Sequence, residues 1–216
     1  MSPRDRILDA ATTVFRRHGF RRSSIEETAE AAGLTRQALY HHFKSKEALF
    51  RAVIERVHDG ALAGGADAAE RAETAGKALA DIVVAQIAAR LQAFVASFDG
   101  SPHIEELFSE HLNHARDLYQ HYAALYDAQI AATIARAVKR QKLTLAPGMT
   151  AAKLARYVEL AITGTKSAYP SMRPADAFLR DAEAMLRTLI AGAITASKKP
   201  KPKPSARPVR KAGVRK

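Results

Sequence analysis

Apolar residues recur at helical spacing along most of this 216-residue chain. Between Arg4 and His18 they stand three or four positions apart, which places them on one face of a helix. These residues are Ile7, Ala11, Val14, Phe15 and His18. Gly19 follows as a natural helix stop. No stretch shows the sustained alternation of apolar and polar residues expected of a strand, and no segment repeats, so the pattern predicts an all-α protein.

Side chains that cap helices divide the next thirty residues. Ser24 followed by Glu27 has the form of a capping box, and it begins a second helix in "SSIEETAEAAG" that Gly33 ends. Thr35 caps a short third helix within "GLTRQALYHHF". Ser45 caps a fourth helix, "KEALFRAVIERVHDGALA". We therefore expect four helices before residue 63.

Apolar runs between turn residues mark the remaining helices. Residues 59–76 hold four glycines and are predicted to be a loop or a frayed helix end. A long apolar helix is expected over 76–98, and the stretch 102–143, which contains neither Gly nor Pro, is either one very long helix or two. Two more helices are expected over 151–167 and 174–196, the last with Pro174 at its first position.

The short third helix, about 12 Å long, is marginal by itself and needs tertiary anchors. Leu39 and Phe43 fall within about 40° of each other at ~100° per residue, and together with Leu34 they dock the helix onto its neighbours. Two helices joined by a short turn that contains glycine have the form of a helix-turn-helix. The anchors leave the opposite face free to be presented.

The presented face carries groups that suit DNA. Arg36 can pair with guanine, Gln37 with adenine, and Ala38 can touch a thymine methyl group. Tyr40 and His41 can donate to phosphate. An ordinary solvated helix face is the alternative interpretation of such a surface.

Two helix N-termini beside this face favour the DNA interpretation. Lys46 follows the Ser45 cap, at a position where the helix dipole disfavours a cation, but a phosphate there would meet both the lysine and the helix end. Ser24 offers a second such helix end. We therefore prefer a DNA-facing surface to a solvated one.

The run "SSIEETAEAAGLTRQALYHHFKSKEALF", residues 23–50, closely resembles the DNA-binding signature of the TetR/AcrR family of transcriptional regulators. The preceding "ILDAATTVFRRHGF" is similar to the first helix of that family. The resemblance covers the first quarter of the chain and implies an all-α homodimer whose fourth helix links the DNA-binding helices to a ligand-binding and dimerisation domain. It also implies that one group of residues faces bases or adjacent phosphates, namely Arg36, Gln37, Ala38 and His41. A second group would hold the DNA backbone, namely Ser24, Thr35, Tyr40 and Lys46. Gln37 departs from the small residue that many family members have.

The chain is predicted to have three parts. By the resemblance, residues 1–46 are the helix-turn-helix DNA-binding domain and 47–196 the effector-binding and dimerisation domain; by composition, 197–216 are a disordered tail rich in Lys and Pro. The net charge is +12, and the tail carries nine Lys or Arg and no acid, which leaves +3 for the remainder. Such a tail is expected to bind nucleic acid without sequence preference. A solubilising role is the alternative.

The candidate residues for lining an effector pocket lie between the fifth and eighth helices. They are Phe94, Phe98, Phe108, His111, Tyr122, Tyr126 and Tyr157. Plain core is the alternative for these aromatic residues. The histidines His103, His111, His114 and His121 suggest a metal site, and His111 and His114 with Glu110 could share an ion, but the spacings are not diagnostic. No metal and no cofactor are therefore predicted.

The last two helices have wide faces of small and apolar residues, which pack either inside the monomer or also across a two-fold axis in a four-helix dimer interface. These residues are Leu154, Val158, Ala161, Ile162 and Thr165 in one helix, and Phe178, Ala182, Met185, Leu186, Leu189 and Ala193 in the other.

Composition narrows the class of function. The chain has no Cys, no signal peptide and no apolar run near the ~18 residues of a membrane span, so a cytoplasmic protein without membrane attachment is expected. Motifs of phosphate loops, nucleophile elbows and zinc proteases are not found, and the protein is not expected to be an enzyme. The leading hypothesis is a repressor that binds a palindromic operator as a dimer and is released by an unknown small-molecule effector. An architectural DNA-binding protein driven by the tail and a transcriptional activator are the alternatives.

Overall fold

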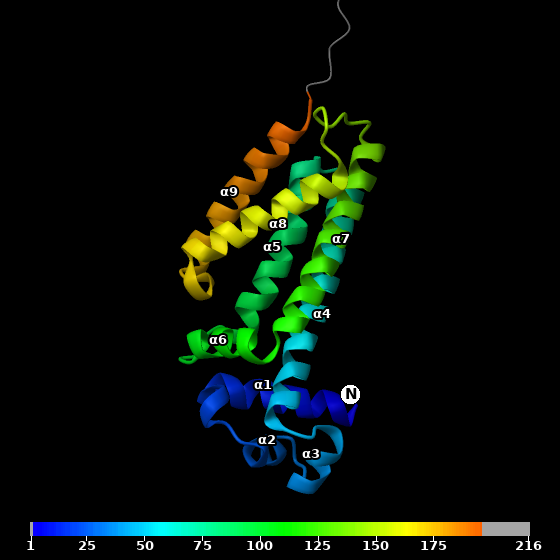
Figure 1. Cartoon of the computed structure of the whole chain (residues 1–216). Helices are drawn as coiled ribbons and strands as arrows, with labels where there is room; N and C mark the ends of the chain where they lie inside the picture. The colour runs from blue at the N-terminus through cyan, green and yellow to red at the C-terminus, as the bar shows by residue number, and fades with distance from the viewer. Residues whose placement is uncertain (1, 196–216) are drawn as a thin grey trace, which may run out of the picture.

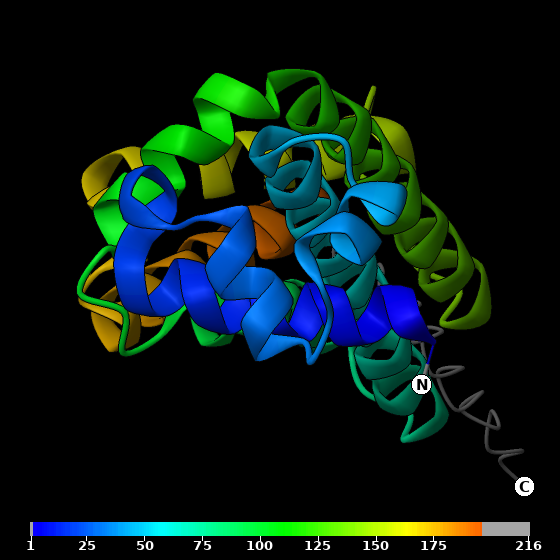
Figure 2. The ribbon, with the colours of Figure 1, turned by 90° about the horizontal axis from the view of Figure 1, so that it is seen from below.

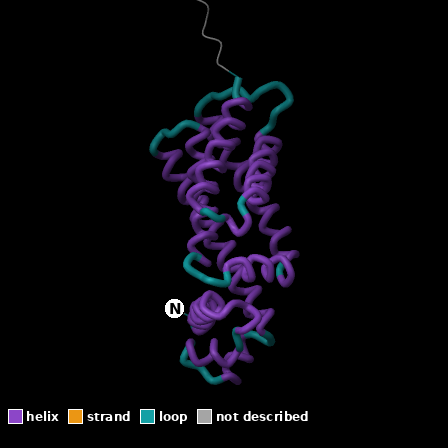
Figure 3. The backbone as a smooth tube through the Cα atoms, turned by 90° about the vertical axis from the view of Figure 1, so that its left-hand side faces the viewer, coloured by secondary structure: helices purple, strands orange, loops and turns teal. Residues whose placement is uncertain are grey.

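The computed structural model describes residues 2–195, and these residues form an α-helical protein (Figure 1). Within that range the only β contact is an isolated antiparallel bridge between Leu145 and Ile194. Figure 3 shows helices through almost the whole path of the chain, joined by short loops. The all-α prediction is confirmed. The predicted tail, 197–216, lies outside the described residues.

Three helices form a small unit at one end of the molecule: α1 (Pro3–Arg22), α2 (Ile25–Ala31) and α3 (Arg36–His42). Seen from below, this unit lies in front of the other helices (Figure 2). The predicted capping box is present, since the Ser24 hydroxyl accepts from the Glu27 amide at 3.1 Å and the Glu27 carboxylate accepts from the Ser24 amide at 2.8 Å. Gly19, with φ of 75°, breaks the helical path as predicted, although one more turn follows it.

Helix α4 (Lys46–Thr74) is longer than predicted, because residues 59–74 continue the helix. The prediction of a loop or frayed end over 59–76 was wrong. Gly65 serves packing: a Cβ there would lie 3.2 Å from the Gln86 carbonyl oxygen of α5 (Leu79–Phe98), closer than most Cβ contacts. The chain turns only at Gly76, whose φ is +67°. Close approach of α4 and α5 therefore explains Gly65, whereas a Cβ on Gly60 or Gly64 would meet nothing within 4 Å.

Residues 102–143 form two helices, α6 (Ile104–His114) and α7 (Arg116–Arg140). They part at the buried Ala115, whose backbone angles leave the helical range. Helix α6 lies between α1 and the upper helices (Figure 1). The chain ends its described part with α8 (Ala151–Ala168), the short 3-10 helix η1 (Pro170–Met172) and α9 (Ala175–Ala193). Pro174 is the N-cap of α9 and not its first helical residue as predicted, and α9 ends three residues early.

Two hydrophobic cores meet at α6. The first joins α1–α3 to the start of α4, with Phe15, Phe20 and Phe50 in mutual ring contact. The second fills the space between α4, α5 and α7–α9. Phe108 and Leu118 pack against both cores. This arrangement lets α6 and the start of α7 connect the small N-terminal unit to the larger one.

Helix α5 is long and apolar enough to span a membrane by length and composition, unlike the sequence-based expectation that no segment qualifies. Half of its apolar window is buried, against α4, α7 and α9. A core helix of this kind passes the same test of length and composition. The packing accounts for its hydropathy without a bilayer.

Candidate functional site

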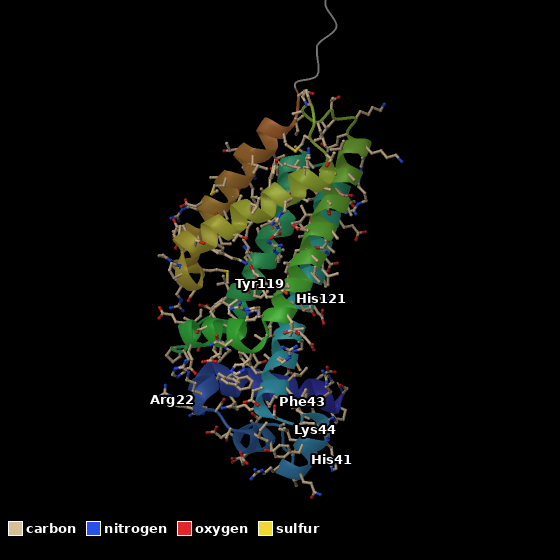
Figure 4. All side chains as sticks on the ribbon, in the orientation of Figure 1. Arg22, His41, Phe43, Lys44, Tyr119 and His121 are labelled. Atoms are coloured by element: carbon tan, nitrogen blue, oxygen red, sulfur yellow. The ribbon has the colours of Figure 1, made fainter. Side chains whose placement is uncertain are left out.

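Helix α3 is anchored from one side and presented from the other. Leu39 and Phe43 are buried, as predicted, in the core shared with α1 and α4. Arg36, Gln37 and His41 are exposed and Ala38 is half-buried. His41 and Lys44 lie at the end of the molecule farthest from α8 and α9 (Figure 4). We call Arg36, Gln37, Ala38 and His41 the reading face.

Arg36 on the reading face is held in place by two neighbours. Its Nε lies 2.8 Å from the Glu26 carboxylate of α2, and its guanidinium stacks 5.5 Å from the centre of the Tyr40 ring. A hydrogen bond to Tyr40, helped by the charge of Glu26, raises the pKa of Arg36. The guanidinium, 64% exposed, remains accessible to a DNA base or phosphate. Tyr40 itself is half-buried beside it.

The two predicted caps differ in what they can still offer a phosphate. Thr35 is exposed, and its hydroxyl oxygen accepts from the Ala38 amide at 3.1 Å, so its hydrogen is available. Ser24 is half-buried, and its hydroxyl also donates to the Glu27 carboxylate at 3.1 Å. Thr35 is therefore the better phosphate donor of the two.

Lys46 has a different role from the one its position suggested. Its Nζ donates to the carbonyl oxygens of Phe20 at 2.9 Å, Arg21 at 3.3 Å and Ser23 at 3.1 Å, and it lies 4.6 Å from the centre of the Phe20 ring. The ammonium thus satisfies the carbonyl end of α1, where a cation is favoured. The predicted phosphate contact by Lys46 needs this correction, because the ammonium already donates to three carbonyl oxygens of the chain.

Lys44 is a DNA-contact candidate that the sequence reading missed. It is exposed beside α3, and its only hydrogen bond to a described residue is with the Tyr40 carbonyl oxygen at 3.3 Å. A lysine that directly follows the anchor Phe43 was the available signal.

Ion pairs connect α1 to α6 and the first part of α4 to α7. The Arg21 side chain lies 2.8 Å from the buried Glu110 carboxylate, and the Arg21 amide donates to Glu106 at 2.7 Å. Burial raises the pKa of Glu110, but the hydrogen bond and charge of Arg21 outweigh it, and the pKa is lowered. Arg51 of α4 makes a two-point pair with Asp117 at the start of α7, at 2.6 and 2.7 Å. The contacts of Arg21 join α6 directly to α1.

A partly enclosed cavity of about 370 Å³ lies above this contact, lined by residues of α4–α8 and η1. Four predicted pocket residues line it: Phe94, Phe108, His111 and Tyr126. Its volume is in the range of small-molecule sites, and its wall is mostly apolar with a few polar groups, which is typical of such sites.

A chain of polar groups in the cavity wall joins three helices. The His58 ring on α4 lies 2.9 Å from the Tyr126 hydroxyl of α7 and 3.4 Å from the His111 ring of α6. Burial lowers the pKa of His58 to about 3 and that of His111 to about 4, so both rings are neutral at pH 7. The sequence reading missed His58, because nothing on α4 marked it as inward-facing.

The cavity wall also holds charged groups that the sequence reading missed. Arg90 of α5 forms a buried ion pair with Glu159 of α8, and Lys166 stands two turns farther along α8. An arginine within the apolar run "IVVAQIAARLQAF" was a signal, since charge on the buried face of a helix needs a partner.

Residues 7–53 match the family model described as bacterial regulatory proteins of the tetR family. The regulator UidR of Escherichia coli is 42% identical over 60 residues, which cover 28% of this chain and 31% of UidR. Residues 7–53 therefore belong to the TetR family. The match spans less than a third of the length of UidR, so it concerns the N-terminal part of this chain.

Solved structures of TetR-family proteins share the fold over a much larger part. SmeT, the repressor of a Stenotrophomonas maltophilia multidrug efflux pump, aligns with a TM-score of 0.58 at 23% identity and covers 89% of this chain and 90% of its own. A TetR transcription regulator from Haloarcula marismortui aligns with a TM-score of 0.66 at 14% identity and covers 89% of this chain and 98% of its own. Identities this low establish the fold alone.

Three of the predicted pocket residues lie elsewhere in this TetR-family fold. Phe98 belongs to the N-terminal core, where it contacts the Phe108 ring. Tyr122 stacks on the back of His58, and its hydroxyl donates to Asp59 at 2.6 Å. Tyr157 is 43% exposed on the outside of α8. The prediction for these three needs correction, because helical spacing alone did not say which neighbour each face meets.

The histidines suspected of sharing a metal ion point to different partners. His111 faces His58 in the cavity, whereas His114 lies 3.1 Å from Glu110 on the side of α1. His103 lies beside Arg22, and His121 is exposed. Within residues 2–195 no group of three or more His, Asp or Glu side chains could hold a metal ion.

Proposed function

We propose that this TetR-family protein is a cytoplasmic transcriptional regulator and not an enzyme, and that it binds a palindromic operator as a homodimer. It acts as a repressor, as SmeT does by its name, and a small molecule releases it. The observation that carries the proposal is the geometry of α3: two buried anchors hold a helix whose opposite face, with Arg36 and Gln37, is polar and exposed. Arg and Gln are side chains that pair with bases in the major groove.

The reading face would make the base contacts and its neighbours the backbone contacts. Arg36, Gln37, Ala38 and His41 would meet bases or adjacent phosphates. Thr35, Tyr40, Ser24 and Lys44 would hold phosphates. Lys46 is left out, since its ammonium is bound to three carbonyl oxygens of the chain.

The homodimer would form through the outer side of α8 and α9. Most of the apolar residues predicted for a dimer face, such as Leu154, Phe178 and Leu186, are buried inside the monomer. The outer side still exposes three large apolar residues: Tyr157 at 43%, Leu160 at 49% and Met185 at 45%. A second copy that covers them would also place the two reading faces of the dimer in successive turns of the major groove, ~34 Å apart.

Sedimentation of Leu160→Glu tests the interface. Leu125→Glu on α7 is the matched control, since Leu125 is 39% exposed. We expect Leu160→Glu to shift the population toward monomer at micromolar protein while Leu125→Glu stays dimeric. Equal behaviour of the two variants contradicts this interface.

The position of the cavity would allow a ligand to change the orientation of the N-terminal unit, α1–α3. A ligand that contacts His58 acts on α4, and one that contacts His111 acts on α6, whose Glu110 holds Arg21 of α1. A shift of α6 would tilt the N-terminal unit and change the distance between the two reading faces of the dimer. By linkage, operator DNA must weaken effector binding by the factor by which effector weakens DNA binding.

Selection of bound fragments from the source genome at ~0.15 M salt tests the proposal. A specific regulator keeps a few fragments that share a palindromic motif, whereas an architectural protein loses binding broadly as salt rises. Deletion of residues 197–216 should lower non-specific affinity and leave the motif unchanged. Reporter expression with and without the protein separates a repressor from an activator. Recovery of fragments without any shared motif overturns the proposal.

A further inference from the structure

The cavity wall holds a lysine that makes no ion pair with any described residue. Arg90 is paired with Glu159, and its guanidinium stacks 4.4 Å from the centre of the Tyr126 ring. Lys166 lines the same cavity and makes no hydrogen bond or ion pair within residues 2–195. Glu105 also lines the cavity, but it stands exposed on α6 and forms no ion pair with Lys166.

None of the other titratable groups that face Lys166 forms an ion pair with it. They are His58 on α4, Arg90 on α5, Glu105 and His111 on α6, Tyr119 and Tyr126 on α7, Glu159 on α8, and Tyr169 before η1. Both histidines are neutral at pH 7, because burial lowers the pKa of each far below that value. Arg90 pairs with Glu159, and the exposed Glu105 forms no ion pair with Lys166. The Lys166 ammonium therefore has no ion-pair partner among the described residues.

Lys166 is still a cation at neutral pH, although its surroundings disfavour the charge. Burial, with repulsion from Arg90, lowers the pKa of its ammonium to about 8. Lys166 is half-buried in the cavity wall, and a bound anion would pair with its ammonium through a charge-assisted hydrogen bond. Apolar side chains, among them Phe94, Phe108 and Met172, line the same cavity.

We infer that the effector is an organic acid: a small molecule with one anionic head against Lys166 and an apolar body against the aromatic wall. The inference rests on the proposed function, in which this cavity is the effector site, and it adds the chemical class of the ligand. A neutral hydrophobic molecule would leave the Lys166 ammonium unpaired, and a cation would be repelled by Lys166 and Arg90.

Two fluorescent probes of the same shape and different charge test this class. The anion 1-anilinonaphthalene-8-sulfonate and the uncharged N-phenyl-1-naphthylamine share their rings and differ in the sulfonate. Each is titrated into the full-length protein and into Ala123→Phe, which fills the cavity from α7. We expect the anion to bind wild-type protein tighter than the neutral probe and to lose that binding in Ala123→Phe.

The decisive variant is Lys166→Met, which keeps the length of the stem and removes the charge. We expect it to weaken the anionic probe at least tenfold and to change the neutral probe by less than twofold. Lys166→Arg, which keeps the positive charge, should bind the anionic probe nearly as tightly as wild-type protein does. Lys153→Met is the matched control on the same helix, since Lys153 is exposed and lies outside the cavity lining, and it should bind both probes as wild type does.

The pH profile gives a second readout that a structural role would not move. The sulfonate stays ionised, so affinity of wild-type protein for the anionic probe should fall as the pH rises through the Lys166 pKa, which the bound anion shifts upward from about 8. Lys166→Arg should hold its affinity through pH 9.5. Thermal melting checks that Lys166→Met folds, and we expect an unchanged or higher Tm, because the variant removes a half-buried charge that has no ion-pair partner among the described residues.

Equal binding of the two probes, or equal loss of both in Lys166→Met, overturns the acid class. Anion binding that survives Ala123→Phe also overturns it, because the anion then binds elsewhere. Operator binding without any probe, measured in parallel, keeps the two proposals apart. If the neutral probe binds in the cavity and releases DNA while the anion does not, the acid class fails and the effector site stands. If neither probe binds the cavity or changes operator affinity, the effector site fails as well.

Discussion

Replacement of Lys46 by Met separates two roles that a lysine at this position can have. In the structure its ammonium makes three hydrogen bonds to the carbonyl oxygens of Phe20, Arg21 and Ser23 at the end of α1. Methionine keeps the aliphatic stem over the Phe20 ring and removes the charge. A stability loss is therefore expected, together with little change in the electrostatics of DNA binding.

The magnitude follows from the geometry of the site. A hydrogen bond from a charged donor contributes about 1.5–3 kcal/mol. The three bonds share one half-buried ammonium, and water can reach part of the vacated carbonyls, so we expect a total near the lower bound, about 1.5 kcal/mol. For a chain of this size that corresponds to a Tm lower by roughly 3–6 °C.

The assay combines denaturation, followed by circular dichroism, with DNA binding at several salt concentrations. Lys44→Met is the matched control: Lys44 is exposed and makes one hydrogen bond, to the Tyr40 carbonyl oxygen. It should cost less than about 0.5 kcal/mol in stability, but it should reduce the slope of log K against log salt by ~0.9, the amount for one phosphate contact. Lys46→Met should leave that slope unchanged. If Lys46→Met retains full stability and loses one unit of slope, the carbonyl-capping role assigned to Lys46 is refuted.

Two further predictions concern the reading face and the cavity. Gln37→Ala should change the preferred base at one position of each half-site, with a loss of ~1–3 kcal/mol of discrimination; selection from a randomised operator measures it, and an unchanged motif removes Gln37 from the base contacts. Folding lowers the pKa of His111 from 6.5 to about 4, so its protonation favours the unfolded state. The neutral ring therefore costs the fold nothing above pH 6.5, and the free energy of unfolding decreases as the pH falls from 6.5 toward 4. Between pH 7 and pH 5 wild-type protein should lose about 2 kcal/mol through this group, and His111→Gln, followed by urea denaturation, should lose correspondingly less; an identical loss in both proteins would contradict the assignment.

The helix-turn-helix was predictable because its determinants are local. Ser24 with Glu27, and Thr35 as a cap, act over three or four residues, so spacing alone shows them. Leu39 and Phe43 recur at i, i+4, which fixes the buried side of α3 whatever covers it. Such short-range rules also locate the reading face opposite them.

The roles of individual residues outside that unit depend on distant partners. The position of Lys46 after a helix cap predicts a phosphate ligand. Its ammonium instead donates to carbonyl oxygens at the end of α1, 23 to 26 positions earlier in the chain. The glycines of α4 looked like breakers, but Gly65 accommodates α5 through a contact that no local rule contains. Propensity is a weak prior wherever tertiary packing overrides it.

The cavity could be predicted only in part for the same reason. Aromatic residues at helical spacing included Phe94, Phe108, His111 and Tyr126, which line the cavity, but also Tyr157 on the outer side of α8. The charges that distinguish the cavity, Arg90 and Lys166, come from α5 and α8, which lie far apart in the sequence. Their meeting is a property of the fold.

The central claim is that the outward side of α3 lies in the major groove, and the absence of cysteine from the chain allows a direct test. His41→Cys and His121→Cys each introduce a unique exposed thiol, at the far end of α3 and on α7 respectively (Figure 4). An iron chelate attached to each thiol cleaves nearby DNA when the labelled protein is bound to the fragment recovered by genomic selection. We expect the His41→Cys conjugate to cut within both half-sites and the His121→Cys conjugate to leave the bound fragment intact. Cleavage by His121→Cys at the protected site, with none from His41→Cys, would contradict the account.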